Sequence, residues 1–373
     1  MLQPATEADL AEAVKTATGP LRVVGGGTRD IGRPVVGTAL SVTGLHGIDL
    51  YEPGALTVVV RAGTPLDDLE RALAAENQRL PFEPMDHRPL LGTTGTPTIG
   101  GVVAANVSGP RRVQGGACRD FLLGVRFVDG TGTVVKNGGR VMKNVTGYDL
   151  VKLMAGSWGT LGVLTELSFK VLARPETETT LVAEGLTAEQ GVAALSRALG
   201  SPFDVSGAAH VGGGQTLVRV EGLEGSVRYR AGRLAELLPG FETVSGDQSA
   251  ALWRDVRDVN VFAGREGAVW RVSVKPTDGP VLSAALTSAG VPHEALFDWG
   301  GGLVWLLMPS VSADTVRHEV AALGGHATLV RATQADRAAV PVFQPEPAPL
   351  AAITTGLRQR FDPRGLLNPG LMG

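Results

Sequence analysis

The chain has 373 residues, which is enough for two or three domains, because folded domains typically contain about 100–200 residues. Its apolar content of 43% is ordinary for a globular protein, and its net charge of −3, without any block of like charges, argues against nucleic acid as a partner. The single cysteine, Cys118, forms no internal disulfide and cannot hold an iron–sulfur cluster alone, so such a cluster has to sit on another chain.

The N-terminal residues lack the basic start and apolar core of a signal peptide. No stretch of about 18 strongly apolar residues is present, so we expect no transmembrane segment. The expected location is the cytoplasm, and peripheral attachment to the inner membrane through partners stays open.

The first elements of the chain alternate between helix and strand. Thr6 and Asp9 resemble a capping box, which predicts a helix directly after them. The apolar strand 21–24 then runs straight into Gly25-Gly26-Gly27-Thr28. The next expected elements are strands 40–43 and 56–61 and a helix that Thr64-Pro65 opens as cap and first residue.

A glycine-, threonine- and proline-rich segment, 89–116, predicts a long loop, and loops of that length in compact domains usually have a function. A hairpin follows, with strands 125–128 and 133–135 turned at Asp129-Gly130. A second glycine-rich stretch, 156–162, leads into a strand at 163–172.

The composition changes near Ala173, and beyond it a strand–helix–strand–strand–helix–strand pattern occurs twice, which is typical of ferredoxin-like units. The first copy has strands 180–183, 205–210 and 216–220 and helices 187–199 and 226–238; the second has strands 269–274, 295–297, 303–308 and 328–331 and helices 280–289 and 313–323. Side by side, the two units predict one broad antiparallel sheet with helices on one face. We expect an α+β protein with domains at 1–173 and 174–340 and a C-terminal segment, 341–373, that contains a helix around 353–360.

The first glycine loop is suited to an anion, because successive glycines after a strand let backbone N–H groups converge on a diphosphate. It is not a Rossmann fingerprint, since the spacing differs from G-x-G-x-x-G and no acidic residue follows about 20 positions later. It is not a P-loop either, because Arg33-Pro34 stands where Lys-Ser/Thr belongs. Three glycine-rich elements in one domain together favour a long, nucleotide-like ligand.

These segments resemble a known family. The motifs that carry the resemblance are Gly25-Gly26-Gly27-Thr28, Thr98-Ile99-Gly100-Gly101, Gly147-Tyr148-Asp149-Leu150 and Gly156-Ser157-Trp158-Gly159-Thr160-Leu161-Gly162. They are similar to the PCMH-type FAD-binding domain of the vanillyl-alcohol-oxidase family. The ending Phe361-Asp362-Pro363 with Asn368-Pro369-Gly370 resembles the C-terminal signature of its 2-hydroxy-acid dehydrogenase branch.

The resemblance implies a set of residues around FAD. They are Gly25, Gly26, Gly27, Thr28 and Arg29 at the diphosphate, Thr98, Gly100, Gly101, Ala104, Asn106 and Ser108 along the cofactor, Gly159, Gly162 and Val163 against the adenosine end, and Asn368 returning from the tail to the flavin ring region. Relatives with covalent flavin have a histidine in the first glycine loop. Here Thr28 and Arg29 stand there, so we expect non-covalent FAD.

A narrower resemblance is to the FAD-binding E subunits of bacterial glycolate oxidases. It rests on the segments Gly139–Asp149, Ser108–Arg112, Trp299–Gly301 and Gly324–Thr328. The resemblance implies oxidation of glycolate, a small 2-hydroxy acid, to glyoxylate, with a larger FAD-containing subunit and an iron–sulfur subunit as partners. Two alternatives stay open: a non-catalytic flavin subunit for electron relay or assembly, and a stand-alone FAD-linked dehydrogenase of another 2-hydroxy acid.

Catalytic residues are less clearly marked. The carboxylate of a 2-hydroxy acid needs a cation, preferably arginine, and the candidates are Arg271, Lys275 and Arg254. His326 is a further candidate, because it falls within a motif of the resembled subunit. No His-x-His or His-Glu-x-x-His spacing occurs, so no metal site is predicted.

The remaining candidates also have a purely structural interpretation. Trp270, Trp299 and Trp305 lie among glycines of the second domain, where they form either a wall near the flavin or part of the aromatic core. Cys118 occupies a position of the resembled subunit that usually has a small residue, and we interpret it as a packed side chain.

Overall fold

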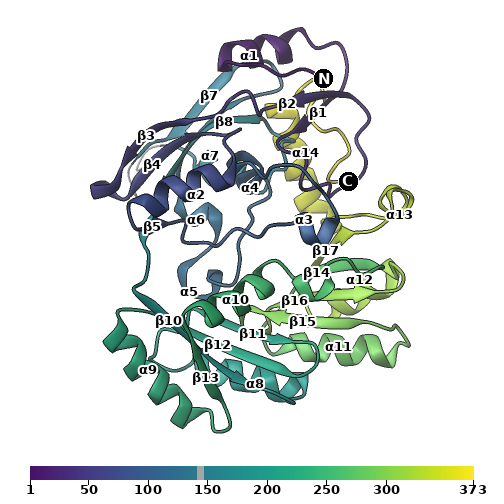
Figure 1. Cartoon of the computed structure of the whole chain (residues 1–373). Helices are drawn as coiled ribbons and strands as arrows, with labels where there is room; N and C mark the ends of the chain where they lie inside the picture. The colour runs from purple at the N-terminus through teal and green to yellow at the C-terminus, as the bar shows by residue number, and fades with distance from the viewer. Residues whose placement is uncertain (141–146) are drawn as a thin grey trace.

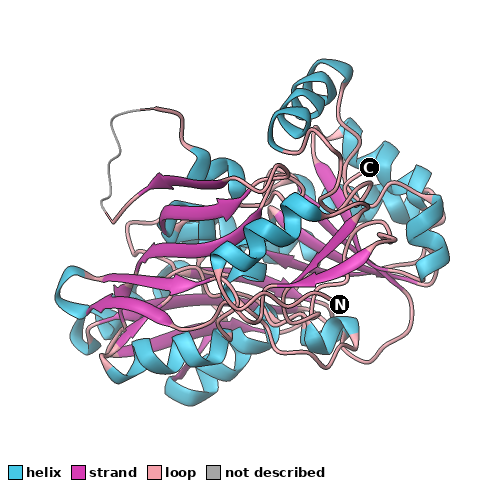
Figure 2. Cartoon of the chain, turned by 90° about the horizontal axis from the view of Figure 1, so that it is seen from above, coloured by secondary structure: helices cyan, strands magenta, loops and turns pink. Residues whose placement is uncertain are grey.

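The computed structural model describes residues 1–140 and 147–373. Its two largest sheets, one of five strands and one of eight, form two stacked parts of the molecule (Figure 1). Seen from above, the strands lie in the middle of the molecule and the helices lie around them (Figure 2). Part of the segment Gly139–Asp149 that the sequence singled out, residues 141–146, lies outside the described residues.

The N-terminal part is a small layer built on a parallel strand pair. Helix α1 (Glu7–Thr16) begins with the predicted capping box, in which Thr6 Oγ1 accepts from the Asp9 N–H at 3.1 Å. Strand β1 (Leu21–Val24) pairs in parallel with β2 (Thr38–Ser41). The core of this layer contains Leu10, Val14, Leu21, Leu40 and Leu367, so the C-terminal tail is part of it.

The five-stranded antiparallel sheet has the order β3-β4-β8-β6-β7. Its strands are β3 (Ile48–Glu52), β4 (Thr57–Arg61), β8 (Val163–Lys170), β6 (Leu122–Val128) and β7 (Val134–Gly138). The predicted hairpin is confirmed, with Val128 opposite Val134. Helices α2 (Leu66–Ala75) and α7 (Leu150–Met154) accompany the sheet, and β5 (Gln78–Arg79) pairs with β9 (Leu172–Ala173) at its border. The cap of α2 is Pro65 rather than Thr64, whose hydroxyl instead donates to the Arg61 carbonyl at 2.7 Å.

The expectation of a long loop at 89–116 is partly wrong, because the segment contains short helices. These are α3 (Arg88–Leu91), α4 (Ile99–Ala104) and α5 (Arg112–Gly115), followed by α6 (Cys118–Phe121). Thr98 caps α4 by accepting from the Gly101 N–H at 3.3 Å. Glycine has a low helix propensity, so the sequence pattern concealed a helix whose buried face contacts the sheet.

The eight-stranded antiparallel sheet joins two ferredoxin-like units edge to edge, as predicted. The first unit comprises β10 (Thr177–Ala183), α8 (Ala188–Leu199), β11 (Gly207–Val211), β12 (Gln215–Gly222), α9 (Glu224–Leu237) and β13 (Glu242–Ser245). The second comprises β14 (Ala268–Ser273), α11 (Asp278–Ser288), β15 (Glu294–Asp298), β16 (Leu303–Met308), α12 (Ala313–Ala322) and β17 (His326–Arg331). Within the full order β13-β10-β12-β11-β15-β16-β14-β17, the units meet at β11 and β15.

Helix α10 (Gly246–Arg257) corrects the expectation of helices on one face. Leu181, Val218 and Ala208 pack in the core with α8 and α9, whereas Ala209 and Leu217, on the other side of the same strands, pack with Trp253 of α10. This helix lies on the face of the sheet that is turned toward the five-stranded part (Figure 1).

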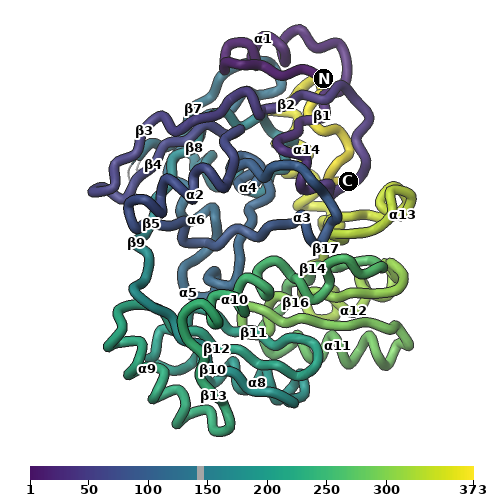
Figure 3. The backbone as a smooth tube through the Cα atoms, in the orientation of Figure 1, coloured from purple at the N-terminus to yellow at the C-terminus, as the bar shows by residue number. Residues whose placement is uncertain are grey.

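The C-terminal segment returns to the first part of the molecule. After β17 come the short helix α13 (Gln334–Ala339) and the longer helix α14 (Ala348–Phe361). The tail, yellow in Figure 3, then runs beside β1, where Leu367 forms a parallel bridge with Leu21. The limits 1–173, 174–340 and 341–373 stay a prediction. No helix among the described residues is long and apolar enough to cross a bilayer.

Candidate FAD site and the sheet face opposite it

The glycine loop that follows β1 packs backbone against backbone. A Cβ atom on Gly26 would lie 1.5 Å from the Thr96 carbonyl oxygen, and one on Gly95 would lie 1.7 Å from the Gly26 carbonyl oxygen. A Cβ on Gly25 would lie 2.5 Å from Thr98 Oγ1. The loop therefore requires glycine for its contact with the segment before α4, and Gly95 is a member of this contact that the sequence motifs did not indicate.

A cavity of about 330 Å³ opens between this loop, the start of α4 and the C-terminal tail. Of the residues that the resemblance implied, the following line it: Gly25, Gly26, Gly27, Thr28, Arg29, Thr98, Gly100, Gly101, Ala104, Gly159, Gly162, Val163 and Asn368. The structure adds residues to the lining that the sequence did not single out: Arg22, Val23, Val24, Asp30, Ile31, Arg33, Val35, Val42, Ala62, Trp158, Leu164 and Leu371. Apart from the glycine-rich stretch that contains Trp158, no local motif marked these added residues.

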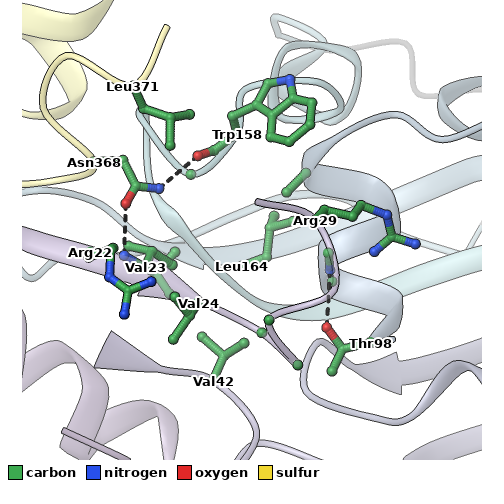
Figure 4. Close-up of a pocket in the computed structure, with 18 of the residues that line it drawn as sticks. Arg22, Val23, Val24, Arg29, Val42, Thr98, Trp158, Leu164, Asn368 and Leu371 are labelled. Atoms are coloured by element: carbon green, nitrogen blue, oxygen red, sulfur yellow. Dashed lines mark hydrogen bonds between the residues drawn. The ribbon is translucent and has the colours of Figure 1, made fainter. Parts of the chain in front are cut away.

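Asn368 holds two walls of the cavity together (Figure 4). Its Oδ1 accepts from the Val23 N–H at 2.8 Å, and its Nδ2 donates to the Trp158 carbonyl at 2.8 Å. Both polar atoms of the Asn368 amide therefore bond to the protein backbone, and the residue fixes the shape of the cavity.

Asn106 and Ser108 do not line this cavity, and they fix the start of α6 instead. Ser108 Oγ accepts from the Cys118 N–H at 2.9 Å, and Asn106 Oδ1 accepts from the Arg119 N–H at 3.1 Å. Cys118 is fully buried, and burial raises the pKa of its thiol, which fits the interpretation of a packed side chain.

Arg29 brings a cation to the cavity wall. Its Nε donates to His87 Nδ1 at 3.2 Å, whereas its Nη2 is buried and has no hydrogen-bond partner in the described chain. Burial lowers the pKa of Arg29 to about 10, although Asp86 opposes the shift, so the guanidinium stays charged at neutral pH. Burial and the neighbouring Arg29 lower the pKa of His87 to about 3, which keeps its imidazole neutral.

The lining fits a phosphate-bearing cofactor. The lining contains three arginines, Arg22, Arg29 and Arg33, and one acid, Asp30. The buried Arg29 Nη2 has no partner, and an acceptor on a ligand would satisfy it. The glycine backbones permit the close approach that a diphosphate needs. No histidine, cysteine or tyrosine occurs in this lining, so within the described residues nothing there is suited to a covalent link to flavin.

A second cation lies on the eight-stranded sheet. Cross-strand register places Leu296, Trp305, Arg271 and Thr328 in one row across β15, β16, β14 and β17. Residues directly opposite each other share a face of the sheet. The face opposite to this row packs against α11 and α12, so Arg271 points toward the five-stranded part.

Arg271 lies among aromatic rings and other cations. Its guanidinium carbon is 5.2 Å from the centroid of Trp299 and 6.0 Å from that of Trp305, while Arg112 lies 4.5 Å from the Trp299 centroid. Trp299 also donates from Nε1 to the Gly109 carbonyl at 3.0 Å, which ties this wall to the first part of the chain. Burial, together with Arg112, lowers the pKa of Arg271 to about 10. Arg271 forms no ion pair within residues 1–140 and 147–373.

The other candidates are placed differently. Lys275 and Arg254 are exposed, the former just after β14 and the latter on α10. His326 begins β17 opposite Ser273, two positions from Arg271, and its side chain is exposed; partial desolvation together with Arg271 lowers the pKa of His326. Trp270 is fully buried in the core. In the described part of the chain, no cluster of three or more His, Cys, Asp or Glu side chains is arranged to bind a metal.

Comparison with known proteins identifies the family. Residues 1–138 match the FAD binding domain family. Over 356 residues the chain is 40% identical to the glycolate oxidase subunit GlcE of Escherichia coli, covering 95% of this chain and 92% of that protein. The chain belongs to the GlcE family of glycolate oxidase subunits. It is therefore an FAD-linked oxidoreductase with a PCMH-type FAD-binding domain.

More distant relatives match a part of the chain or share its fold. The glycolate oxidase subunit GlcD of Bacillus subtilis is 36% identical over 128 residues, which are 34% of this chain and 26% of that protein. The structure of 4-ethylphenol oxidase from Gulosibacter chungangensis superposes with a TM-score of 0.71 at 14% identity, covering all of this chain and 88% of that one. Alkyldihydroxyacetonephosphate synthase gives 0.69 at 16% identity over 98% of this chain and 76% of that one. These two structures share the fold of this chain.

Proposed function

We propose that this chain is the FAD-carrying subunit of a complex that oxidises glycolate to glyoxylate. The observation that carries the proposal is the similarity to a named glycolate oxidase subunit along nearly the whole of both chains. FAD, when bound, would supply the redox chemistry by taking up the two electrons of the oxidation as a hydride. The cavity behind the glycine loop, with Arg29 in its wall, is the proposed FAD site, and the cofactor is held there without a covalent bond.

Arg271 is the proposed partner of the substrate carboxylate. It faces the FAD-binding part and forms no ion pair in the described chain, and although the nearby Asp298 opposes the shift, burial and the neighbouring Arg112 lower its pKa. Both Arg29 and Arg271 lower the pKa of the buried His87, which supports a shared electrostatic environment for the three groups. A bidentate carboxylate would give the guanidinium of Arg271 the partner that it lacks.

The proton of the substrate hydroxyl needs an acceptor, and His326 is the candidate. Its lowered pKa keeps the imidazole neutral at physiological pH, and it lies on the same face of the sheet as Arg271. His87 is neutral as well, but it is buried and accepts from Arg29 through Nδ1. In this scheme His326 takes the proton, Arg271 orients the carboxylate and the tryptophans exclude water.

The electron acceptor is proposed to be an iron–sulfur subunit, with a larger FAD-containing subunit as a further partner. The chain has one cysteine, and that cysteine is buried, so the chain supplies no cluster ligands of its own. The similarity of 128 residues of the chain to the glycolate oxidase subunit GlcD of Bacillus subtilis supports a related partner.

An anaerobic titration of the purified, FAD-loaded chain with glycolate tests the proposal. Bleaching of the visible flavin band supports oxidation by this chain. The Arg271→Met variant should lower kcat/KM by about 10- to 100-fold, the loss expected for hydrogen bonds to a charged group. The exposed residues offer matched controls, Arg254→Met and Lys275→Met, which should leave the reaction unchanged.

The outcomes separate the alternatives. Flavin that stays oxidised with glycolate but is bleached by another 2-hydroxy acid indicates a dehydrogenase of that acid. Flavin that stays oxidised with every 2-hydroxy acid, yet is reduced through partner subunits, indicates an electron-relay subunit. The relay is the second candidate, because the sequence marks no base for the substrate hydroxyl beyond the lone His326.

A further inference from the structure

One buried arginine links the last part of the chain to the FAD loop. Arg337 of α13 donates from Nη1 to the carbonyls of Asp30 and Gly32, at 2.7 and 3.1 Å, and from Nη2 to Asp30 Oδ2 at 2.6 Å. Its side chain is only 9% exposed, and its partners are about 305 residues away in sequence. Hydrogen bonds from a charged donor to backbone carbonyls fix the position of the backbone itself, and they do not depend on the side chains of that segment.

The segment that Arg337 holds is part of the cavity wall. Asp30, Ile31 and Arg33 line the cavity directly after Arg29, whose buried Nη2 has no partner. Arg33 also donates from Nη2 to the Ala338 carbonyl of α13 at 2.7 Å. A shift of α13 would therefore move the segment that orients Arg29.

The C-terminal tail closes the other side of the same segment. The Arg33 N–H donates to the Leu371 carbonyl at 3.0 Å, and a Cβ on Gly32 would lie 2.8 Å from Leu371 Cγ. Gly32 also has a φ of +109°, which favours glycine. The segment is therefore held between the tail on one side and α13 on the other.

Helix α13 itself depends on this contact. Arg337 is the only buried residue among its six, and the helix follows β17, the edge strand that contains His326 and Thr328. The buried contact of α13 with the Asp30–Arg33 segment is thus made by Arg337, beside the bond from Arg33 to the Ala338 carbonyl.

We propose that Arg337 is a positioning residue for FAD, through which loading of the cofactor is coupled to docking of α13 and of the sheet edge before it. It acts through the Asp30–Arg33 segment and touches the cavity only indirectly. Coupling of this kind is reciprocal: FAD stabilises the docked helix to the same extent as the docked helix strengthens FAD binding. The proposal rests on FAD binding alone and is independent of the substrate.

The first experiment is a titration of the flavin-free full chain with FAD, followed by fluorescence. Arg337→Met should raise the Kd for FAD about tenfold, as expected when hydrogen bonds from a charged group are lost, and Arg337→Lys should restore part of the affinity. Arg230→Met is the matched control, because Arg230 also donates to backbone carbonyls, those of Phe203 and Glu221, but lies away from the cavity. It should lower stability and leave the Kd unchanged. An unchanged Kd in Arg337→Met overturns the proposal.

Hydrogen exchange of the wild-type chain gives a second test that needs no variant to fold. FAD should slow amide exchange in 30–33 and also in 334–340, a segment that does not line the cavity. If FAD leaves exchange in 334–340 unaltered, the coupling is wrong. Neither readout uses glycolate, so a failure here is distinguishable from a failure of the proposed oxidation.

Discussion

At the scale of single residues, Asp298 is a buried carboxyl group outside the cavity whose pKa is strongly shifted. It is 3% exposed at the end of β15, and its Oδ1 accepts from the Trp299 N–H at 2.7 Å. Burial, together with the nearby Glu83, raises the pKa of Asp298 to about 7 from 3.8. The folded protein therefore holds this carboxyl in its protonated form more readily than the unfolded chain does.

The raised pKa makes a prediction about Asp298→Asn. Asparagine keeps the acceptor for Trp299 but has no charge to bury. The contribution of protonated Asp298 to stability is fully present below pH 3.8 and is lost as the pH rises through about 7. Relative to the wild type, the variant should therefore gain free energy of unfolding between pH 4 and 7 and keep a gain of more than about 1 kcal/mol at pH 8. Urea unfolding at several pH values measures this, and a gain that is the same at pH 4 and pH 8 would contradict it.

At the scale of elements, the FAD cavity depends on two glycine backbones in contact. Gly26 follows β1 and Gly95 precedes α4. A Cβ atom added to either glycine would lie far inside the van der Waals contact distance to a carbonyl oxygen of the other segment. The contact aligns the glycine loop with the start of α4, which together form one side of the cavity. An atom added at either position would have to displace rigid backbone, because no flexible side chain is there to move aside.

Gly95→Ala should therefore separate the loop from α4. We expect a stability loss of about 2 kcal/mol, the usual cost of overpacking, and FAD affinity reduced at least tenfold. Gly54→Ala is the control, because a Cβ at Gly54 meets nothing within 4 Å and its φ is not positive. Thermal unfolding measures the stability of both variants, and titration with FAD measures their affinities. Equal FAD affinities of Gly95→Ala and Gly54→Ala would refute the role of Gly95.

At the scale of the whole molecule, a buried ion network joins the two large sheets. Arg219 of β12 donates to both carboxylate oxygens of Glu83, at 3.0 and 2.9 Å, and it also lies 3.3 Å from Glu221. Arg79 and Arg111, from the FAD-binding part, pair with the same Glu221. Arg219 is 2% exposed, so its charge depends on these partners.

Removal of one partner should loosen the whole molecule. Glu83→Gln leaves the guanidinium of Arg219 undercompensated, and we expect the free energy of unfolding to fall by about 3 kcal/mol. Asp68→Asn, which breaks an exposed pair with Arg71, should cost less than about 1 kcal/mol. Denaturant unfolding compares the two, and similar losses for both would show that the buried network does not join the parts.

Local physics accounts for what the sequence predicted well. Capping by Thr6, the turn at Asp129-Gly130 and the periodicity of the two ferredoxin-like units act over a few residues, and the structure confirms them. Helix α10 was missed, because the sequence pattern did not reveal that Trp253 packs beneath a sheet face formed by distant strands. The glycine-rich helix α4 was missed because burial against the sheet outweighs its low propensity.

The fold class, the glycine loop and, through the resemblance, the FAD cofactor could be predicted from the sequence, because the residues that approach a diphosphate lie together in short motifs. Which cations meet depends on the tertiary structure. Arg271 faces the FAD-binding part because strand register turns it away from the helices. Arg29 meets His87 across 58 positions, and Arg337 meets Gly32 across 305. Such pairs are set by sheet order and domain packing, and no local pattern of residues encodes either.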